Sequence, residues 1–270
     1  MKTTTWSRDG VRLAAATAGV GDGPAMVLLH GMGSDHTHVE VLASMFGDRY
    51  FTVLPDLRGH GASDQESDRH DIATLADDVA WLCAQLGVHD ITLVGHSLGG
   101  VVSLAVAAAH PGLVSRLVLL DPGIALSDEM SAGLSDFYAG LDDETYAAVL
   151  REYLIPLMFV PSDPPQTVQA VMDCLTAMPL RVFRQLGEGI VAFDSMAAVA
   201  RVSCPTAVVT PQFMIGDIAR VEAAAPGWEF GRVLGTGHYM QMVTPEQTEA
   251  MITQFLRTHP LGGGHGEHAS

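Results

Sequence analysis

The sequence is poor in basic residues and cysteine, and it has no long apolar run. Its 270 residues include 14 lysines and arginines against 31 aspartates and glutamates, a formal charge of −17 at pH 7. Because such a field repels phosphate, we expect neither nucleic acid nor an anionic membrane surface as a partner. No apolar stretch approaches the length of a membrane span, and the first residues lack the apolar core of a signal peptide. We therefore expect a soluble, cytoplasmic protein.

The three cysteines, Cys83, Cys174 and Cys204, are odd in number and far apart. Their spacing fits neither a disulfide framework nor a zinc site, so we expect reduced thiols and no metal. The sequence also lacks a phosphate-binding loop and a dinucleotide-type glycine pattern in the right context. No cofactor is therefore expected.

The alternation of apolar runs with helical patterns predicts an α/β fold. Hydrophobic residues make up 48% of the chain, enough for the core of one large domain. Asp9-Gly10 is a strong turn pair and predicts a hairpin over residues 3–18. Continuous apolar runs, typical of strands buried on both faces, occur at residues 25–29, 51–54, 91–94, 116–120, 205–209 and 230–234. Helical patterns between them, as at residues 72–86, predict a doubly wound, mostly parallel sheet.

The alternation stops after residue 123. From about residue 124 to 199 the sequence shows only helical pieces separated by prolines, which predicts an inserted helical lid. The core is then expected in two parts, residues 1–123 and 200–260. A tail at residues 261–270, rich in glycine and histidine, is expected to be disordered.

One turn combines a strand, a tight corner and a helix. The apolar run at residues 91–94 stops at Gly95-His96-Ser97-Leu98-Gly99, and a helical run of small residues follows. A serine at such a corner has strained backbone and a hydroxyl that points above the sheet. The N–H of Leu98 then lies at a helix N-terminus, where an oxyanion is stabilised. The motif also occurs by chance, so its value depends on the strand and helix around it.

A serine hydroxyl needs a neutral imidazole nearby to accept its proton. Among the 12 histidines, His30 and His96 belong to turns and are expected to brace the backbone. Only His238 follows the last expected strand in a glycine loop, late in the chain. We therefore interpret His238 as the base, with a structural loop histidine as the alternative.

Between about residues 25 and 259 the chain resembles the α/β-hydrolase family. The resemblance is carried by His30-Gly31, Asp56-Leu57-Arg58-Gly59-His60-Gly61-Ala62-Ser63, Gly95-His96-Ser97-Leu98-Gly99-Gly100 and Gly237-His238. It implies a mostly parallel, eight-stranded type of sheet flanked by helices, with the lid as the variable part. It also implies that Ser97 is the nucleophile and His238 its base. The N–H groups of Met32 and Leu98 would then form the oxyanion hole.

The acid that should hold the imidazole has two candidates. Most members of the family place it after the strand expected here at residues 206–209, but the first carboxylate in that loop is Asp217. Asp217 also stands where a helix N-cap is expected. Some members, including haloalkane dehalogenases, certain lactone hydrolases and cofactor-free dioxygenases, place the acid where this chain has Asp121. We favour Asp121, although members that do not use this position also carry an aspartate there.

The resemblance and the residues favour hydrolysis of an ester or lactone through an acyl-enzyme on Ser97. A serine at this corner argues against a dehalogenase or epoxide hydrolase, in which the resemblance implies aspartate. The apolar lid indicates a small or medium apolar substrate. The residues expected to bind it are His30, Gly31, Tyr138, Tyr153, Leu157, Met158, Phe183 and Met240.

Two other classes of function stay open at this point. One is a different reaction on the same residues, such as C–C bond hydrolysis or cofactor-independent oxygenation. The other is a non-catalytic ligand receptor built on the same fold. The presence of both Ser97 and His238 counts against a receptor, which has no need of either.

Overall fold

The computed structural model describes residues 1–212 and 216–261 and contains an eight-stranded sheet in the order β1-β2-β4-β3-β5-β6-β7-β8. Strand β2 pairs antiparallel with β1 and β4, and the remaining neighbours are parallel. The expected mostly parallel sheet is confirmed. Its strands are β1 (Lys2–Arg8), β2 (Val11–Gly19), β3 (Ala25–Leu29), β4 (Phe51–Asp56), β5 (Ile91–His96), β6 (Val114–Leu120), β7 (Thr206–Thr210) and β8 (Glu229–Arg232).

The first hairpin and the central strands form for the local reasons that the sequence indicates. Asp9 and Gly10 both have positive φ, 51° and 84°, as a two-residue hairpin turn requires. Strands β3, β5 and β7 are buried along their whole length, because helices cover both faces of the sheet.

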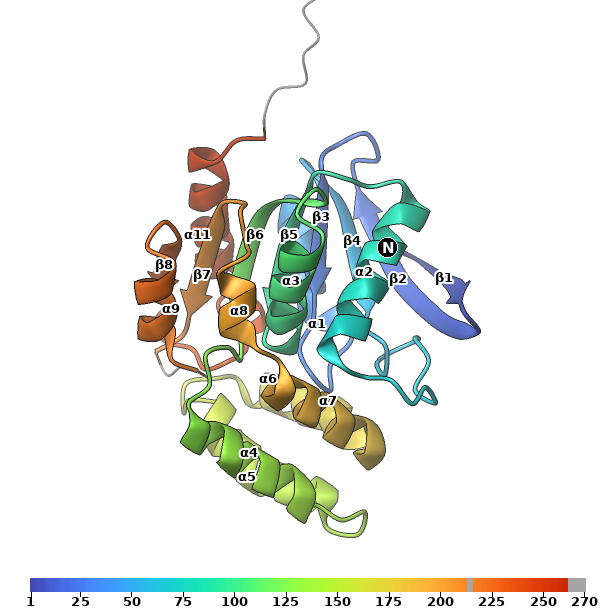
Figure 1. Cartoon of the computed structure of the whole chain (residues 1–270), viewed down its shortest axis with the longest axis vertical. Coiled ribbons are helices and arrows are strands. Elements are labelled where there is room, and N and C mark those ends of the chain that lie inside the picture. The colour runs from blue at the N-terminus through green and yellow to red at the C-terminus, as the bar shows by residue number, and fades with distance from the viewer. Residues whose placement is uncertain (213–215, 262–270) are drawn as a thin grey trace, which may run out of the picture.

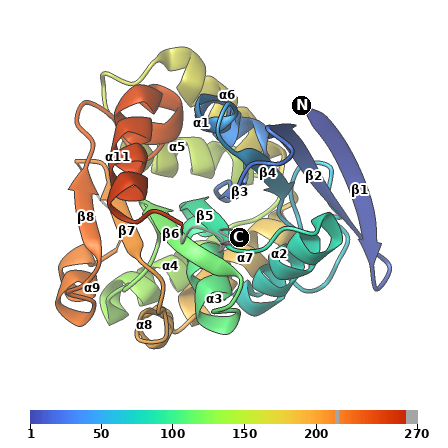
Figure 2. The same ribbon diagram turned by 90° about the horizontal axis from the view of Figure 1, so that it is seen from above.

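Helices lie on both faces of the sheet (Figure 2). One face carries α2 (Ile72–Leu86), α3 (Leu98–Ala109) and α8 (Ser195–Val199), and the other carries α1 (Thr37–Phe46) and α11 (Pro245–Thr258). The apolar side chains form two clusters, and α1 and α11 contribute to the smaller one. Helix α2 covers the predicted residues, with an N-cap bond from Thr74 N–H to the side chain of Asp71 and a left-handed Gly87 at its end.

Four helices between β6 and β7 lie together below the carboxyl ends of the strands (Figure 1). They are α4 (Asp128–Gly140), α5 (Tyr146–Met158), α6 (Pro165–Ala177) and α7 (Leu180–Ala192), and we call them the cap helices. Residues 124–199 contain no strand, only an isolated bridge from Ile124 to Gly216. Helix α8 falls inside the range expected for the lid, but it packs on α3 of the core.

Two short helices complete the described chain, α9 (Ile218–Ala224) and α10 (Met240–Val243). The sequence pattern did not predict α10, because a helix of four residues shows no periodicity. Of the expected tail, only Leu261 belongs to the described residues. Across the part of the chain that the structure describes, no helix has both the length and the hydropathy of a membrane span.

Candidate active site

Ser97 occupies a strained corner between β5 and α3. Its φ and ψ are 54° and −119°, a conformation that costs a non-glycine residue on the order of 1–3 kcal/mol. The corner is held by a hydrogen bond of 3.0 Å from Ser97 N–H to the carbonyl of Leu120. A Cβ on Gly99 would lie 2.5 Å from the carbonyl oxygens of Leu29 and His30, so only glycine lets α3 start this close to β3. The half-buried serine lines a cavity at the carboxyl ends of the strands.

His238 and Asp121 form a buried pair beside this corner. Nδ1 of His238 lies 2.6 Å from Oδ2 of Asp121, and the two side chains are 2% and 0% exposed. Asp121 directly follows β6 with a φ of 41°, and its N–H donates to the carbonyl of Val209 at 2.8 Å. If Nδ1 carries the proton and donates it to the carboxylate, Nε2 remains as the basic nitrogen. Nε2 has no hydrogen-bond partner among the described residues, so the bond to Ser97 is not formed in this structure.

The backbone of His238 is held from two further sides. Its N–H donates to the carbonyl of Met158 at 2.7 Å, at the end of α5. Its carbonyl accepts from Nε2 of His96 at 2.9 Å, and the two imidazole rings are 4.5 Å apart. Because His96 immediately precedes Ser97, this contact places the His238 ring beside the serine corner. Burial and the neighbouring His238 keep the pKa of His96 well below its usual value, so His96 is neutral.

A buried carboxylate also holds the loop before His238. Asp163, which is 6% exposed, accepts hydrogen bonds from Gly237 N–H at 3.2 Å and from Val160 N–H at 2.9 Å. The sequence pattern did not indicate that Asp163 and the Met158 carbonyl hold the loop of His238. Neither belongs to a motif, and both act through backbone atoms of a segment far along the chain.

Two histidines join the loops that follow β3 and β4. Nε2 of His30 accepts from Leu57 N–H at 3.1 Å, and Nε2 of His60 accepts from Gly33 N–H at 3.1 Å. The other ring nitrogens lie 2.8 Å from the carbonyl of Gly31 and 3.1 Å from that of Arg58, as a neutral Nδ1–H ring requires. Burial lowers the pKa of His30 to about 4 and that of His60 to about 3. These bonds fix the loop that carries Met32.

The structure does not bring every expected site residue together. Asp217 is exposed and caps α9, accepting from Arg220 N–H at 3.0 Å, while Asp121 is the carboxylate bonded to His238. Met240 was expected in the pocket, but it is fully buried in the cluster beneath α1 and α11 because α10 turns it away from the cavity. His30 does not line the cavity either, because its ring nitrogens bond to backbone. Gly31 is not in the lining but abuts the corner, since its Cβ would lie 3.2 Å from that of Ser97.

The cavity above Ser97 has a volume of about 100 Å³ and lies between the sheet and the cap helices. The five remaining residues expected to bind substrate all line it, as do Met32 and Leu98. None of its lining residues carries a formal charge at neutral pH, so its only side-chain polar groups are hydroxyls and the Met32 and Met158 thioethers. The lining residues are Met32, Ser97, Leu98, Gly123, Leu126, Leu134, Phe137, Tyr138, Tyr153, Leu154, Leu157, Met158, Leu175, Phe183, Ile190 and Tyr239.

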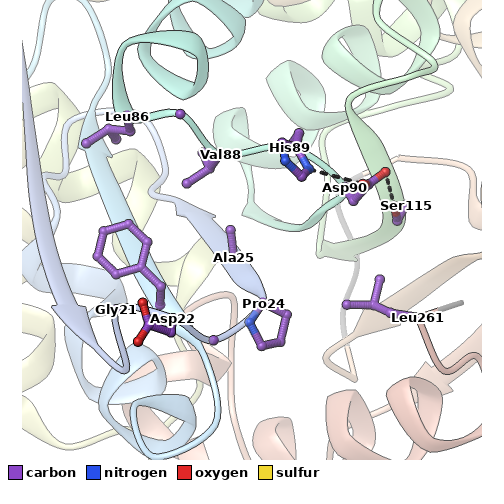
Figure 3. A pocket seen from close by; sticks show the side chains of 13 residues that line it. Gly21, Asp22, Pro24, Ala25, Leu86, Val88, His89, Asp90, Ser115 and Leu261 are labelled. Carbon is purple, nitrogen blue, oxygen red and sulfur yellow. Dashed lines mark hydrogen bonds and ion pairs between the residues drawn. The ribbon is translucent and has the colours of Figure 1, made fainter. Parts of the chain in front are cut away.

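A larger cavity, of about 620 Å³, lies at the opposite end of the strands (Figure 3). It is lined by the residues where β3, β4 and β6 start and by the loop before β5, including Ala25, Phe51, Asp90 and Ser115. Its polar contacts are among exposed or half-buried groups, such as Asp90 with His89 at 3.1 Å. In open α/β sheets the reacting groups gather at the carboxyl ends, so the smaller cavity is the candidate active site. Within residues 1–212 and 216–261, no group of three or more His, Cys, Asp or Glu side chains has a metal-binding arrangement.

Comparisons with known proteins agree with this fold. The family model described as alpha/beta hydrolase fold matches residues 24–154. The 2-(acetamidomethylene)succinate hydrolase of Mesorhizobium japonicum is 30% identical over 249 residues, which cover 87% of this chain and 89% of the relative. A solved esterase from Thermogutta terrifontis superposes with a TM-score of 0.82 at 28% identity, covering 96% of this chain and 98% of the esterase.

Other relatives match only in part. Uncharacterized proteins of Mycobacterium bovis and Mycobacterium tuberculosis are 37% identical over 108 residues, and this match covers 40% of the chain but only 32% of their length. The match to the Mesorhizobium hydrolase, which covers most of both chains, and the family model together show that this chain belongs to the alpha/beta hydrolase fold family.

Proposed function

We propose that this protein is a serine hydrolase that cleaves a small or medium apolar carboxylic ester or lactone through an acyl-enzyme on Ser97. The observation that carries the proposal is the buried 2.6 Å contact between His238 Nδ1 and Asp121 Oδ2, beside the strained corner of Ser97. An aspartate in this position keeps the imidazole in the orientation and tautomer that a general base needs.

In this mechanism Ser97 Oγ attacks the carbonyl carbon of the ester while its proton passes to Nε2 of His238. The imidazolium that forms is stabilised by Asp121. When the tetrahedral intermediate collapses, the bond to the alcohol oxygen breaks and His238 returns the proton to that oxygen. A water molecule then attacks the acyl-serine in the same way, its proton passes through His238 to Ser97 Oγ, and the carboxylic acid leaves.

The developing oxyanion would be held by the N–H groups of Met32 and Leu98. Leu98 opens α3, and the first N–H groups of an α-helix have no intrahelical partner. Met32 lies in the loop that His30 and His60 fix to the loop after β4. Both residues line the cavity that contains Ser97.

The cap helices serve as a lid in this proposal, and their lining favours an uncharged substrate. A carboxylate placed in this cavity would find no lysine or arginine among the lining residues and would lose its hydration. The Mesorhizobium relative acts, by its name, on a succinate derivative. We therefore propose that this chain does not share the dicarboxylate substrate of that relative.

A second candidate reaction is hydrolysis of an acetamide on the same residues. It is favoured by the same relative, which is named for hydrolysis of an acetamidomethylene compound and matches along most of the chain. The catalytic steps are those of the ester, except that the leaving group is an amine that must be protonated by His238.

The test compares purified wild-type protein with Ser97→Ala on uncharged p-nitrophenyl acetate and butyrate, on a small lactone and on p-nitroacetanilide. We expect the wild type to hydrolyse the esters or the lactone, and we expect this activity to be absent in Ser97→Ala. Turnover of the anilide alone would favour the acetamide reaction. If no substrate is cleaved in a Ser97-dependent manner, the ester and amide proposals both fail, and C–C bond hydrolysis, oxygenation or a receptor would have to be considered.

A further inference from the structure

The cavity above Ser97 has an open end and a closed end. At the open end, Tyr153 and Leu157 of α5 line the cavity and are still 48% and 52% exposed. At the closed end, Tyr138 of α4 and Phe183 of α7 line it and are only 6% and 2% exposed. A substrate therefore enters past α5 and meets Tyr138 and Phe183 as the far wall.

The ring of Tyr138 occupies space that a glycine in the facing helix leaves free. A Cβ on Gly187 would overlap three carbons of the Tyr138 ring, including the one that carries the hydroxyl. A glycine inside a helix costs about 1 kcal/mol relative to alanine, so a close contact of this kind explains its place in the middle of α7. The ring also packs edge-on against Phe183, with centroids 5.5 Å apart.

The backbone of α4 is held to α7 at the same point. Nε of Arg184 donates to the carbonyl of Tyr138 at 3.0 Å, and the other end of its guanidinium donates to the carbonyl of Leu141. A wall held by both side-chain packing and backbone bonds cannot move aside without breaking them. It therefore limits the length of whatever group lies between it and Ser97.

In the proposed acyl transfer, the alcohol must leave while the acyl group stays bonded to Ser97. Among the lining residues that the structure describes, Tyr153 and Leu157 of α5 are the most exposed, so the alcohol would leave on that side and the acyl group would lie at the closed end. The cavity volume is about 100 Å³. Because a cavity of roughly 150 Å³ holds a benzene molecule, this one suits an acyl chain of up to about four carbons.

We propose that the contact between Tyr138 and Gly187 sets the acyl length and restricts the enzyme to short-chain acyl groups. This inference rests on the proposed function, because it assumes an acyl-enzyme on Ser97. It adds a specificity residue, Tyr138, and a size limit that the catalytic residues alone do not determine.

The experiment measures kcat/KM for p-nitrophenyl acetate, butyrate and octanoate with the wild type and three variants. Tyr138→Ala removes the wall, and Gly187→Ala pushes the ring of Tyr138 toward the cavity. Tyr146→Ala is the matched control, because Tyr146 is equally buried at 6% exposure and packs on Phe183 but does not line the cavity. Thermal unfolding of each variant shows whether it is folded.

The wild type should prefer acetate and butyrate to octanoate by at least about tenfold, the smaller end of what such pockets discriminate. Tyr138→Ala should raise the ratio of octanoate to butyrate by about tenfold or more, and Tyr146→Ala should leave this ratio unchanged. Gly187→Ala should shift the preference from butyrate toward acetate. This variant tests the same contact if Tyr138→Ala does not fold. Equal turnover of octanoate and butyrate by the wild type would overturn the inference, as would an unchanged profile in both variants. If the wild type cleaves none of these esters in a Ser97-dependent manner, the proposed function itself is rejected.

Discussion

The two sides of the cavity are built by different interactions. The catalytic floor, which we define as the loops after β3 to β6 and after β8, is held by buried polar groups. Arg58, in the loop after β4, forms a two-bond ion pair of 2.7 and 2.9 Å with Asp78 of α2, and the two side chains are 8% and 3% exposed. The cap helices rely on aromatic contacts, on the bonds from Arg184 to two carbonyls at the end of α4 and on exposed ion pairs. One such pair joins Arg151 and Asp173 at 2.8 Å, with side chains 37% and 58% exposed. In the function that we propose, the floor would determine the positions of the reacting atoms and the cap would determine the shape of the substrate.

The largest expected effect of a substitution is on catalysis at the floor. Asp121→Asn keeps the shape of the side chain but removes the negative charge that holds the Nδ1–H tautomer of His238. We expect kcat to fall by about 10⁴-fold. Asp217→Asn is the control, because this exposed side chain caps α9 and is not bonded to His238. Steady-state kinetics on a p-nitrophenyl ester would measure both, and a large loss in Asp217→Asn with little in Asp121→Asn would reverse the assignment of the acid.

The ion pairs Arg58–Asp78 in the floor and Arg151–Asp173 in the cap should contribute differently to the free energy of unfolding. Asp78→Ala leaves Arg58 buried without its partner and also removes the bond of 2.8 Å to Arg8, so the free energy of unfolding should fall by about 3–5 kcal/mol. Arg151→Ala in the cap should cost less than about 1 kcal/mol, because its pair is exposed to water. Urea unfolding followed by circular dichroism measures both. Similar losses for the two variants would contradict the difference between floor and cap.

His96 is expected to act as a positioning residue for His238. His96→Leu removes the donor to the His238 carbonyl and the ring beside it, and a shift of about 1 Å in the base can cost on the order of 10²-fold in rate. We expect the loss in kcat, with KM nearly unchanged. His96→Gln, whose amide can donate to the same carbonyl, should restore part of the rate. A purely structural role would instead lower stability in both variants and leave kcat of the folded fraction at the wild-type value.

Acid should lower the free energy of unfolding, because the catalytic floor contains the buried neutral histidines His30 and His60. Burial lowers the pKa of His60 from 6.5 to about 3, so between these pH values the unfolded chain binds a proton that the folded protein does not. The free energy of unfolding should therefore decrease as the pH falls below 6.5, by on the order of a few kcal/mol from His60 alone. Urea unfolding at about pH 7.5 and about pH 5 measures the slope. His60→Gln should show a smaller decrease than the wild type, and an equal decrease would contradict this role of His60.

The features that the sequence predicted well are encoded locally. The strand before Ser97, the corner itself and the helix after it are adjacent in the chain, so a short pattern specifies all three. Helix α2 likewise carries its own cap, apolar stripe and terminal glycine, and its bounds were predicted as the structure has them. Asp121 and Asp217 were both candidates for the acid, and the choice between them needed the distance to His238, which a sequence pattern does not contain.

The features that the sequence did not predict depend on contacts between distant segments. His30 was expected to brace the backbone, but its bond from Leu57 and the bond from Gly33 to His60 join two loops, and a sequence pattern does not contain such contacts. Met240 follows His238 so closely that it was expected in the pocket, but a short helix turns it into the opposite cluster. The contact of Tyr138 with Gly187 joins two cap helices, and an isolated glycine in a helix does not indicate which side chain it faces.

The central claim is that His238, held by Asp121, activates the hydroxyl of Ser97. The most direct measurement is incubation of the wild type and Asp121→Asn with a fluorophosphonate, followed by mass analysis of the intact protein and its peptides. We predict one adduct per wild-type chain, on the peptide that contains Ser97, and much slower labelling of Asp121→Asn. A wild-type chain that stays unlabelled, or that is labelled at a different residue, would contradict the claim.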